Sequence, residues 1–182
     1  MGVFCFLLSA CSEPSQPENV QAPPQAEPLL SLTELLNAND VKEALASAAK
    51  QDDQQAIADW QERLLEAAEQ VNLLASELKL LSGEQGLMYL NFQGMKTNYQ
   101  REFEEAFFGF GDVDEVYSRY PAFESLQKQS KDLVDKRDAL IQSSAAQLSQ
   151  QGIAPDIALQ QARQQWQAMM QFPLNAGPSG EQ

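Results

Sequence analysis

The chain of 182 residues contains no histidine. Histidine is the usual general base at neutral pH and the commonest transition-metal ligand, so Ser-His-Asp and Cys-His catalysis are excluded. A di-iron site in a helical bundle is excluded as well, because it needs Glu-x-x-His pairs. We therefore expect a protein that is not an enzyme, with no catalytic residues, no metal and no cofactor. A hydrolase built on two converging carboxylates stays a remote alternative, since no spacing in the chain marks such a pair.

Cysteines and basic residues are also scarce. The two cysteines, Cys5 and Cys11, lie in the first eleven residues, so neither a structural disulfide nor a cysteine zinc site is expected. Twelve basic residues against 26 acidic ones give a net charge of -14. A surface of that sign repels phosphate backbones and anionic lipid head groups. We expect no nucleic-acid partner, and any membrane attachment has to come from a hydrophobic anchor.

No apolar run is long enough to span a bilayer, but a short one stands at the N-terminus. Residues 3–10 form an apolar run of eight, which fits the hydrophobic region of a signal peptide. The following segment, Leu8-Ser9-Ala10-Cys11, resembles the lipobox of bacterial lipoproteins. That resemblance implies cleavage before Cys11, a diacylglycerol on its thiol, and a fatty acid such as palmitate on the new amino terminus. Two or three such chains anchor a protein durably, whereas one binds marginally.

The residue after the lipidated cysteine biases sorting in that family, and aspartate there favours the inner membrane. Ser12 therefore implies the outer membrane, with the domain facing the periplasm of a Gram-negative cell. The first four residues contain no basic side chain, unlike the usual start of such signals, so a start upstream of Met1 is left open. An apolar N-terminal segment without function is the alternative.

Composition, together with what the lipoprotein resemblance implies, divides the chain into four expected segments. Residues 1–10 are the signal segment, and residues 11–30 are the lipidated cysteine with a tether rich in Pro, Gln, Ser and Glu, a composition that does not fold by burial. Residues 31–172 carry helical patterns and form one domain, and residues 173–182 are expected to be a disordered tail.

The longest pattern is a seven-residue apolar repeat between residues 57 and 81. It predicts one continuous helix from Asp52, capped with Gln55 in its first turn, to Ser82-Gly83. The repeat positions are Ile57, Trp60, Leu64, Ala67, Val71, Leu74, Leu78 and Leu81. A second helix begins at Ser82 and ends at the segment 108–111.

Further start signals predict the remaining helices. Asp112 with Glu115 begins a short helix to Tyr120, Pro121 begins a long one to Gln151, and Pro155 begins the last. Ser31 with Glu34, and Asp40 with Glu43, mark two short N-terminal helices. No segment has the pattern of a strand. The expected fold is all-α, an antiparallel bundle of three to four principal helices with coiled-coil-like packing, plus the short N-terminal helices.

Three features are candidate sites. A stripe of aromatic and methionine residues from Met88 to Phe107 is expected to be core, with an apolar ligand pocket as the alternative. Acidic residues between 102 and 115 are expected to cap helices and face solvent, with a metal site as the alternative. Phe108 and Phe110, which alternate with glycines at a helix junction, either contact a partner or fold back to cap the bundle.

These patterns together indicate a noncatalytic, lipid-anchored helical module of the cell envelope that works through protein contact, as an adaptor or accessory lipoprotein. Excess apolar surface would serve an envelope partner or a second copy of the chain. The rival is a periplasmic carrier that opens to accept an apolar ligand or lipid along the Met88 to Phe107 stripe. A void beside the stripe favours the carrier, and tight packing there with an exposed apolar patch elsewhere favours the adaptor.

Overall fold

The computed structural model describes residues 29–171, and within that range it is all-α with no strand. The all-α prediction is therefore confirmed. The elements are α1 Leu32–Asn37, α2 Asn39–Gln51, α3 Gln54–Gln70, α4 Ala75–Leu81, α5 Gly83–Gly109, α6 Val113–Arg119, the 3-10 helix η1 Pro121–Phe123, α7 Glu124–Gln150 and α8 Pro155–Gln171. The expected signal segment 1–10, residues 11–28 of the tether and the tail 173–182 lie outside the described residues.

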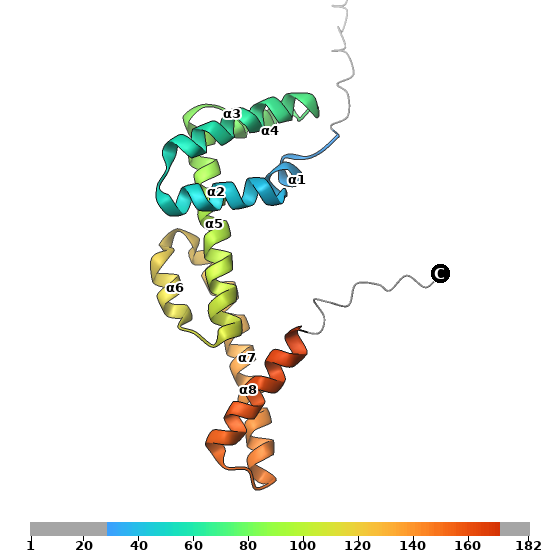
Figure 1. Cartoon of the computed structure of the whole chain (residues 1–182), viewed down its shortest axis with the longest axis vertical. Coiled ribbons are helices and arrows are strands. Elements are labelled where there is room, and N and C mark those ends of the chain that lie inside the picture. The colour runs from blue at the N-terminus through green and yellow to red at the C-terminus, as the bar shows by residue number, and fades with distance from the viewer. Residues whose placement is uncertain (1–28, 172–182) are drawn as a thin grey trace, which may run out of the picture.

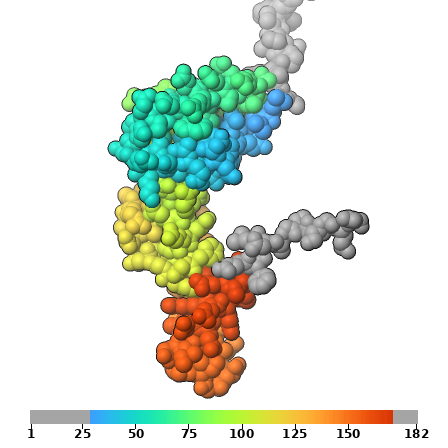
Figure 2. Space-filling view, in the orientation of Figure 1, coloured from blue at the N-terminus to red at the C-terminus, as the bar shows by residue number. Residues whose placement is uncertain are grey.

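The helices follow one another along the long axis of an elongated molecule (Figures 1 and 2). Helices α1 to α4 surround the first half of α5 at one end, α6 lies beside its second half, and α7 and α8 form a hairpin at the other end (Figure 1). Buried apolar side chains gather in three clusters, one for each of these regions. The helices thus pack against one another without sharing a single central core.

A capping motif determines where the first helix, α1, begins, but not where the second helix, α2, begins. Ser31 and Glu34 form the expected capping box of α1, and hydrogen bonds from the Ser31 backbone and side chain lower the pKa of Glu34. Helix α2 begins at Asn39 after Ala38, which has no capping side chain, so the predicted start at Asp40 is wrong. It also runs for 13 residues, because a buried apolar face packs it against α5.

The prediction of a single helix from Asp52 to Ser82 is wrong, because this stretch forms two helices, α3 and α4, with a break between them. Asn72 adopts the left-handed conformation with φ 55°, and the next amide, of Leu73, donates to the Ala68 carbonyl at 3.0 Å. A second bond runs from the Asn72 amide to Glu69, which completes a Schellman motif. Leu73 turns inward and is buried, whereas the repeat position Leu74 is 44% exposed. Without a continuous helix, coiled-coil packing over residues 57–81 cannot form.

The start of α3 is displaced by one residue from the prediction. Asp52 ends α2 in the left-handed conformation with φ 52°, so it does not begin the next helix. Asp53 takes that role, since its carboxylate accepts from the Ala56 amide at 3.0 Å.

Helix α5 buries two different faces along its length. Its first half turns Gly86, Leu90, Gly94 and Asn98 inward at steps of four. Gly86 lies against Leu81 and Gln61, whereas Gly94 and Asn98 meet α2. The absence of a side chain at Gly94 allows the backbone of α2 to approach at Leu45. The buried Asn98 side chain donates from Nδ2 to the Ala46 carbonyl of α2 at 2.7 Å. A close helix crossing, stabilised by the hydrogen bond from the Asn98 side chain, therefore joins α5 to the N-terminal helices.

The second half of α5 packs aromatic rings against α6, η1 and the start of α7. The buried ring of Tyr99 lies 5.5 Å from Phe123 and 6.3 Å from Phe103, between ring centroids. Its hydroxyl meets Ser130 Oγ of α7 at 3.0 Å, and the Tyr117 hydroxyl reaches the same oxygen at 3.0 Å. Because Ser130 donates its own proton to the Gln127 carbonyl, both tyrosines donate to it. Burial is the main cause of a raised Tyr99 pKa.

Candidate interaction surface

The junction at the end of α5 holds the two phenylalanines that the sequence marks for partner contact. Phe110 takes the left-handed conformation with φ 56°, and the Gly111 amide donates back to the Ala106 carbonyl at 2.8 Å. This bond closes the helix end in the position where glycine is most common. A phenylalanine is held there because its ring packs into the cluster between α7 and α8.

Both phenylalanine rings rest on Trp166 of α8. The ring centroid of Phe108 lies 5.8 Å from that of Trp166, and that of Phe110 lies 5.6 Å away. Phe110 is half-buried, whereas Phe108 remains 41% exposed. The two rings therefore fold back onto the bundle, one of the two arrangements expected from the sequence, and a partner contact through the open side of Phe108 stays a prediction.

Arg137 of α7 fastens this junction and was not singled out from the sequence. Its side chain is 7% exposed, and Nη1 donates to the Phe107 carbonyl in the last turn of α5 at 2.6 Å. Nε donates to Asp138 at 2.8 Å, which neutralises the buried charge. The guanidinium carbon lies 4.9 Å from the Phe107 ring and 5.0 Å from the Phe110 ring. Gln167 of α8 adds a bond from Nε2 to the Phe108 carbonyl at 2.8 Å.

A groove opens between α7 and α8. It has a volume of about 350 Å³, and its walls carry Leu140 from α7 with Trp166 and Met169 from α8. Leu140 is 62% exposed and Met169 is 65% exposed, while the indole of Trp166 is buried at the base. Leu140 and Met169 form an exposed apolar strip along this groove, named here the hairpin face.

The hairpin face lies in the least charged part of the chain. Between residues 139 and 171 the only charged side chains are Asp156 and Arg163, and ten residues are glutamine. The whole chain, in contrast, carries -14. An exposed apolar strip surrounded by neutral polar side chains is the composition of a protein contact surface, whose centre is depleted of charge.

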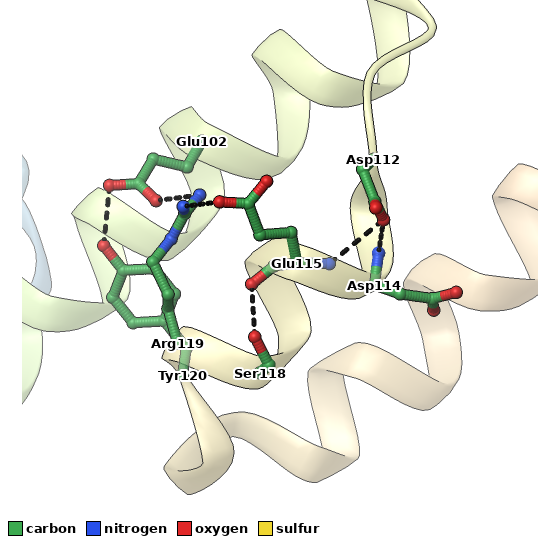
Figure 3. A network of polar contacts seen from close by, with 7 residues as sticks. All are labelled: Glu102, Asp112, Asp114, Glu115, Ser118, Arg119 and Tyr120. Atoms are coloured by element: carbon green, nitrogen blue, oxygen red, sulfur yellow. Dashed lines mark hydrogen bonds and ion pairs between the residues drawn. The ribbon is translucent and has the colours of Figure 1, made fainter.

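Three acids of the stretch between α5 and α6, namely Glu102, Asp112 and Glu115, make side-chain contacts within the chain (Figure 3). Asp112 caps α6, accepting from the amides of Asp114 at 3.0 Å and Glu115 at 3.1 Å. Arg119 lies between two acids, with Nη2 3.0 Å from Glu102 and Nη1 2.9 Å from Glu115. The Arg119–Glu102 pair is an ion pair by distance, although its angle falls short of a hydrogen bond. These acids thus serve as a helix cap and as ion-pair partners.

Tyr120 completes this network by donating its hydroxyl to Glu102 Oε1 at 2.9 Å (Figure 3). Burial, with the hydrogen bond and the charge of Glu102, raises the pKa of Tyr120 to about 12. Across residues 29–171 no group of three or more His, Cys, Asp or Glu side chains is placed to hold a metal ion.

The aromatic and methionine stripe divides between solvent and core. Met88 is 68% exposed and Phe92 is 42% exposed, because the first half of α5 buries its glycine face instead. Further along, the Phe103 ring stacks within 6.4 Å of Tyr117 and lies 5.5 Å from Phe107. Aromatic neighbours thus surround the second half of the stripe, where a carrier would need a void.

Two features of the sequence correspond to parts of the structure that were not predicted, the close helix crossing and the hairpin face. Gly94, a glycine in the middle of a long helix, marks a close helix crossing, and the scarcity of charge between residues 139 and 171 marks the hairpin face. No local signal identifies Arg137, because its partners Phe107 and Phe110 are distant in the sequence.

The predicted lipidation residue Cys11 and sorting residue Ser12 lie outside the described residues. None of the helices between residues 29 and 171 has the length and hydropathy to cross a membrane. The fold and the hairpin face together describe an all-α protein with an exposed apolar strip at one end. Comparison of the chain with known protein families, with curated proteins and with solved structures finds no match.

Proposed function

We propose that this protein is a noncatalytic, lipid-anchored helical module of the cell envelope that acts through protein contact at the hairpin face. The observation that carries the proposal is the exposure of Leu140 and Met169 around a groove in a segment with only two charged residues, Asp156 and Arg163. Exposed apolar patches with a polar rim are the usual mark of a contact site on a soluble domain.

The position of the hairpin face suits a tethered module. The end of the molecule far from the hairpin face holds α1. There the amide of Leu29, at the start of the described chain, donates to the Val71 carbonyl at 2.9 Å. Leu29, the first described residue, therefore lies at the end of the molecule opposite the α7–α8 hairpin (Figure 1). An anchor upstream of Leu29 would leave the hairpin face directed away from the attachment point.

The anchor itself is inferred from the lipobox-like segment ending at Cys11. The net charge of -14 opposes adsorption to an anionic membrane surface, so acyl chains on Cys11 would have to supply the attachment. Ser12 then directs the protein to the outer membrane, with the domain in the periplasm.

Mass spectrometry of the mature N-terminus tests the anchor, using the protein expressed with its native upstream region. A triacylated Cys11 is the expected species, and Cys11→Ser should release the protein into the soluble fraction. The matched control is Cys5→Ser, which should leave lipidation and membrane attachment unchanged. An unprocessed Met1 terminus without lipid would remove the placement in the envelope.

Photo-crosslinking in intact cells tests the contact face. A crosslinking amino acid at position 140 should give a discrete protein adduct. The same amino acid at Leu80, a 51% exposed residue of α4 at the other end of the molecule, should not. Adducts at both positions, or at neither, would count against a contact function located on the hairpin face.

A further inference from the structure

The α7–α8 hairpin covers its apolar core from one side only. Phe107 and Phe110 at the end of α5 pack against Ile141 and Trp166 on one side. On the other side the groove between α7 and α8 stays open, with Leu140 and Met169 at its edges. Two helices alone bury little apolar surface, and the usual completion is a second helix pair, which gives a four-helix bundle.

A polar atom in the wall of this groove also lacks a partner. Trp166 lines the groove and is 3% exposed, yet its Nε1 has no hydrogen-bond acceptor among the described residues. A buried N–H without an acceptor is destabilising.

The distribution of charge indicates which partner fits. A partner of opposite charge would be selected by acids on the contact surface, but the segment 139–171 contributes only Asp156 and Arg163. Two copies of a chain with charge -14 repel each other over most of their surfaces. The hairpin face is where they can meet without placing acids opposite one another.

We propose that a second copy of this chain occupies the hairpin face, so that two α7–α8 hairpins form a two-fold symmetric four-helix bundle. Leu140 and Met169 of each copy then cover the groove of the other. This inference rests on the contact face of the proposed function and names its occupant.

The size of the face sets the strength of the association. Helix α8 has 17 residues. A face about 25 Å long and two helices wide offers on the order of 500 Å² per copy. Stable complexes usually bury about 800 Å² per partner, so the dimer is weak in solution. Tethering two copies to one membrane raises their effective concentration and favours the bundle.

Sedimentation equilibrium of the full chain tests the proposal, with both cysteines changed to serine to exclude disulfide-linked dimers. We expect a monomer–dimer equilibrium between micromolar and millimolar concentration. Leu140→Glu should raise the Kd about tenfold or more, because two-fold symmetry places two new like charges in the interface. Glutamate is a good helix former at this exposed position, so circular dichroism should show an unchanged fold. The control Leu80→Glu adds the same charge away from the face and should leave the Kd unchanged.

Ionic strength gives an independent readout. Salt screens the repulsion between the acidic surfaces of two copies, so dimerisation should strengthen as salt is added. Weakening by salt would show an interface held by opposite charges and would overturn the proposal. A wild-type chain that stays monomeric up to millimolar concentration would overturn it too, as would equal effects of Leu140→Glu and Leu80→Glu.

The two proposals fail differently. If the purified chain is monomeric while crosslinking at position 140 in cells still gives an adduct of another mass, the occupant is a different protein and only the self-association is wrong. If position 140 gives no adduct and the chain is monomeric, the hairpin face has neither role.

Discussion

Gly94 of α5 lies against the backbone carbonyl of Leu45 in α2 so closely that a β-carbon on Gly94 would overlap it. The crossing brings the two helix backbones together and allows the neighbouring Asn98 amide to reach the carbonyl of Ala46. This contact joins the N-terminal helices to the long helix that extends toward the hairpin face.

Gly94→Ala should therefore destabilise the protein. The new methyl group meets backbone and the Ala49 side chain at 2.9 Å, so the helices have to separate, at a cost of about 1–3 kcal/mol. Chemical denaturation monitored by circular dichroism measures the loss. Gly109→Ala in the same helix is the control, because nothing lies within 4 Å of its added carbon and little or no loss is expected there. Equal losses at both sites would show that the crossing is looser than described.

Asn72 should be the residue that permits the break between α3 and α4. Its φ of 55° disfavours residues with a β-carbon, and asparagine tolerates it better than alanine. Asn72→Ala should cost roughly 1 kcal/mol of unfolding free energy, whereas Asn72→Gly should be neutral or slightly stabilising. The comparison is made by thermal and urea unfolding. If the Asn72→Ala and Asn72→Gly proteins were equally stable, residue 72 would not adopt the left-handed conformation that the turn requires.

Ser130 should matter more than its size suggests, because the hydroxyls of Tyr99 and Tyr117 both donate to it. Ser130→Ala leaves these donors without that acceptor and should lower the free energy of unfolding by about 1–3 kcal/mol. Ser143→Ala, at an exposed position on the same helix, serves as the control. If the double variant with Tyr99→Phe and Ser130→Ala were no more stable than Ser130→Ala alone, the contact between the Tyr99 hydroxyl and Ser130 would contribute nothing to the free energy of unfolding.

Arg137→Lys should weaken the end of α5 although the charge is kept. Lysine has no planar fork, so it cannot bond Phe107 and Asp138 together while stacking on Phe110. We expect a loss of roughly 1–3 kcal/mol in urea unfolding. Arg163→Lys, whose guanidinium lies 5.1 Å from the same Phe110 ring on an exposed residue, should cost less. The reverse order would contradict the anchoring role of Arg137.

Stability should fall at alkaline pH. Burial raises the pKa of Tyr120 to about 12 and that of Tyr99 above its usual value of 10.0. Since the folded protein holds these protons more tightly than the unfolded chain, their stabilisation is complete below pH 10 and is lost between about pH 10 and 12. Urea unfolding across this range measures the slope. Tyr120→Phe removes one titrating group, so the free energy of unfolding should depend less steeply on pH. An unchanged slope would mean that other groups cause the loss of stability.

Prediction from the sequence succeeded where the determining contacts are local. The capping box of Ser31 and Glu34 and the cap at Asp112 involve residues three apart, and both helices begin where these signals place them. The start after Ser82 and the end at Gly109 also follow from neighbouring residues.

The misplaced features depend on distant contacts. The heptad repeat predicted one helix over 57–81, but burial of Leu73 in the N-terminal cluster accompanies the turn at Asn72. The stripe beginning at Met88 is apolar, yet the nearby glycine face is buried because it alone allows α2 to approach. For the candidate site, Phe108 and Phe110 were found by their glycine neighbours, whereas Arg137 and Trp166 required the folded chain.

By itself the sequence determined an all-helical domain, an excess of negative charge and the absence of histidine chemistry, because these follow from composition and from residues a few positions apart. Only the tertiary structure decided that the apolar residues divide into three clusters along one axis and that the α7–α8 hairpin keeps one side open. The reason is that the side of a helix that becomes buried depends on how closely another backbone can approach it, and that distance is set by packing between residues far apart in the chain.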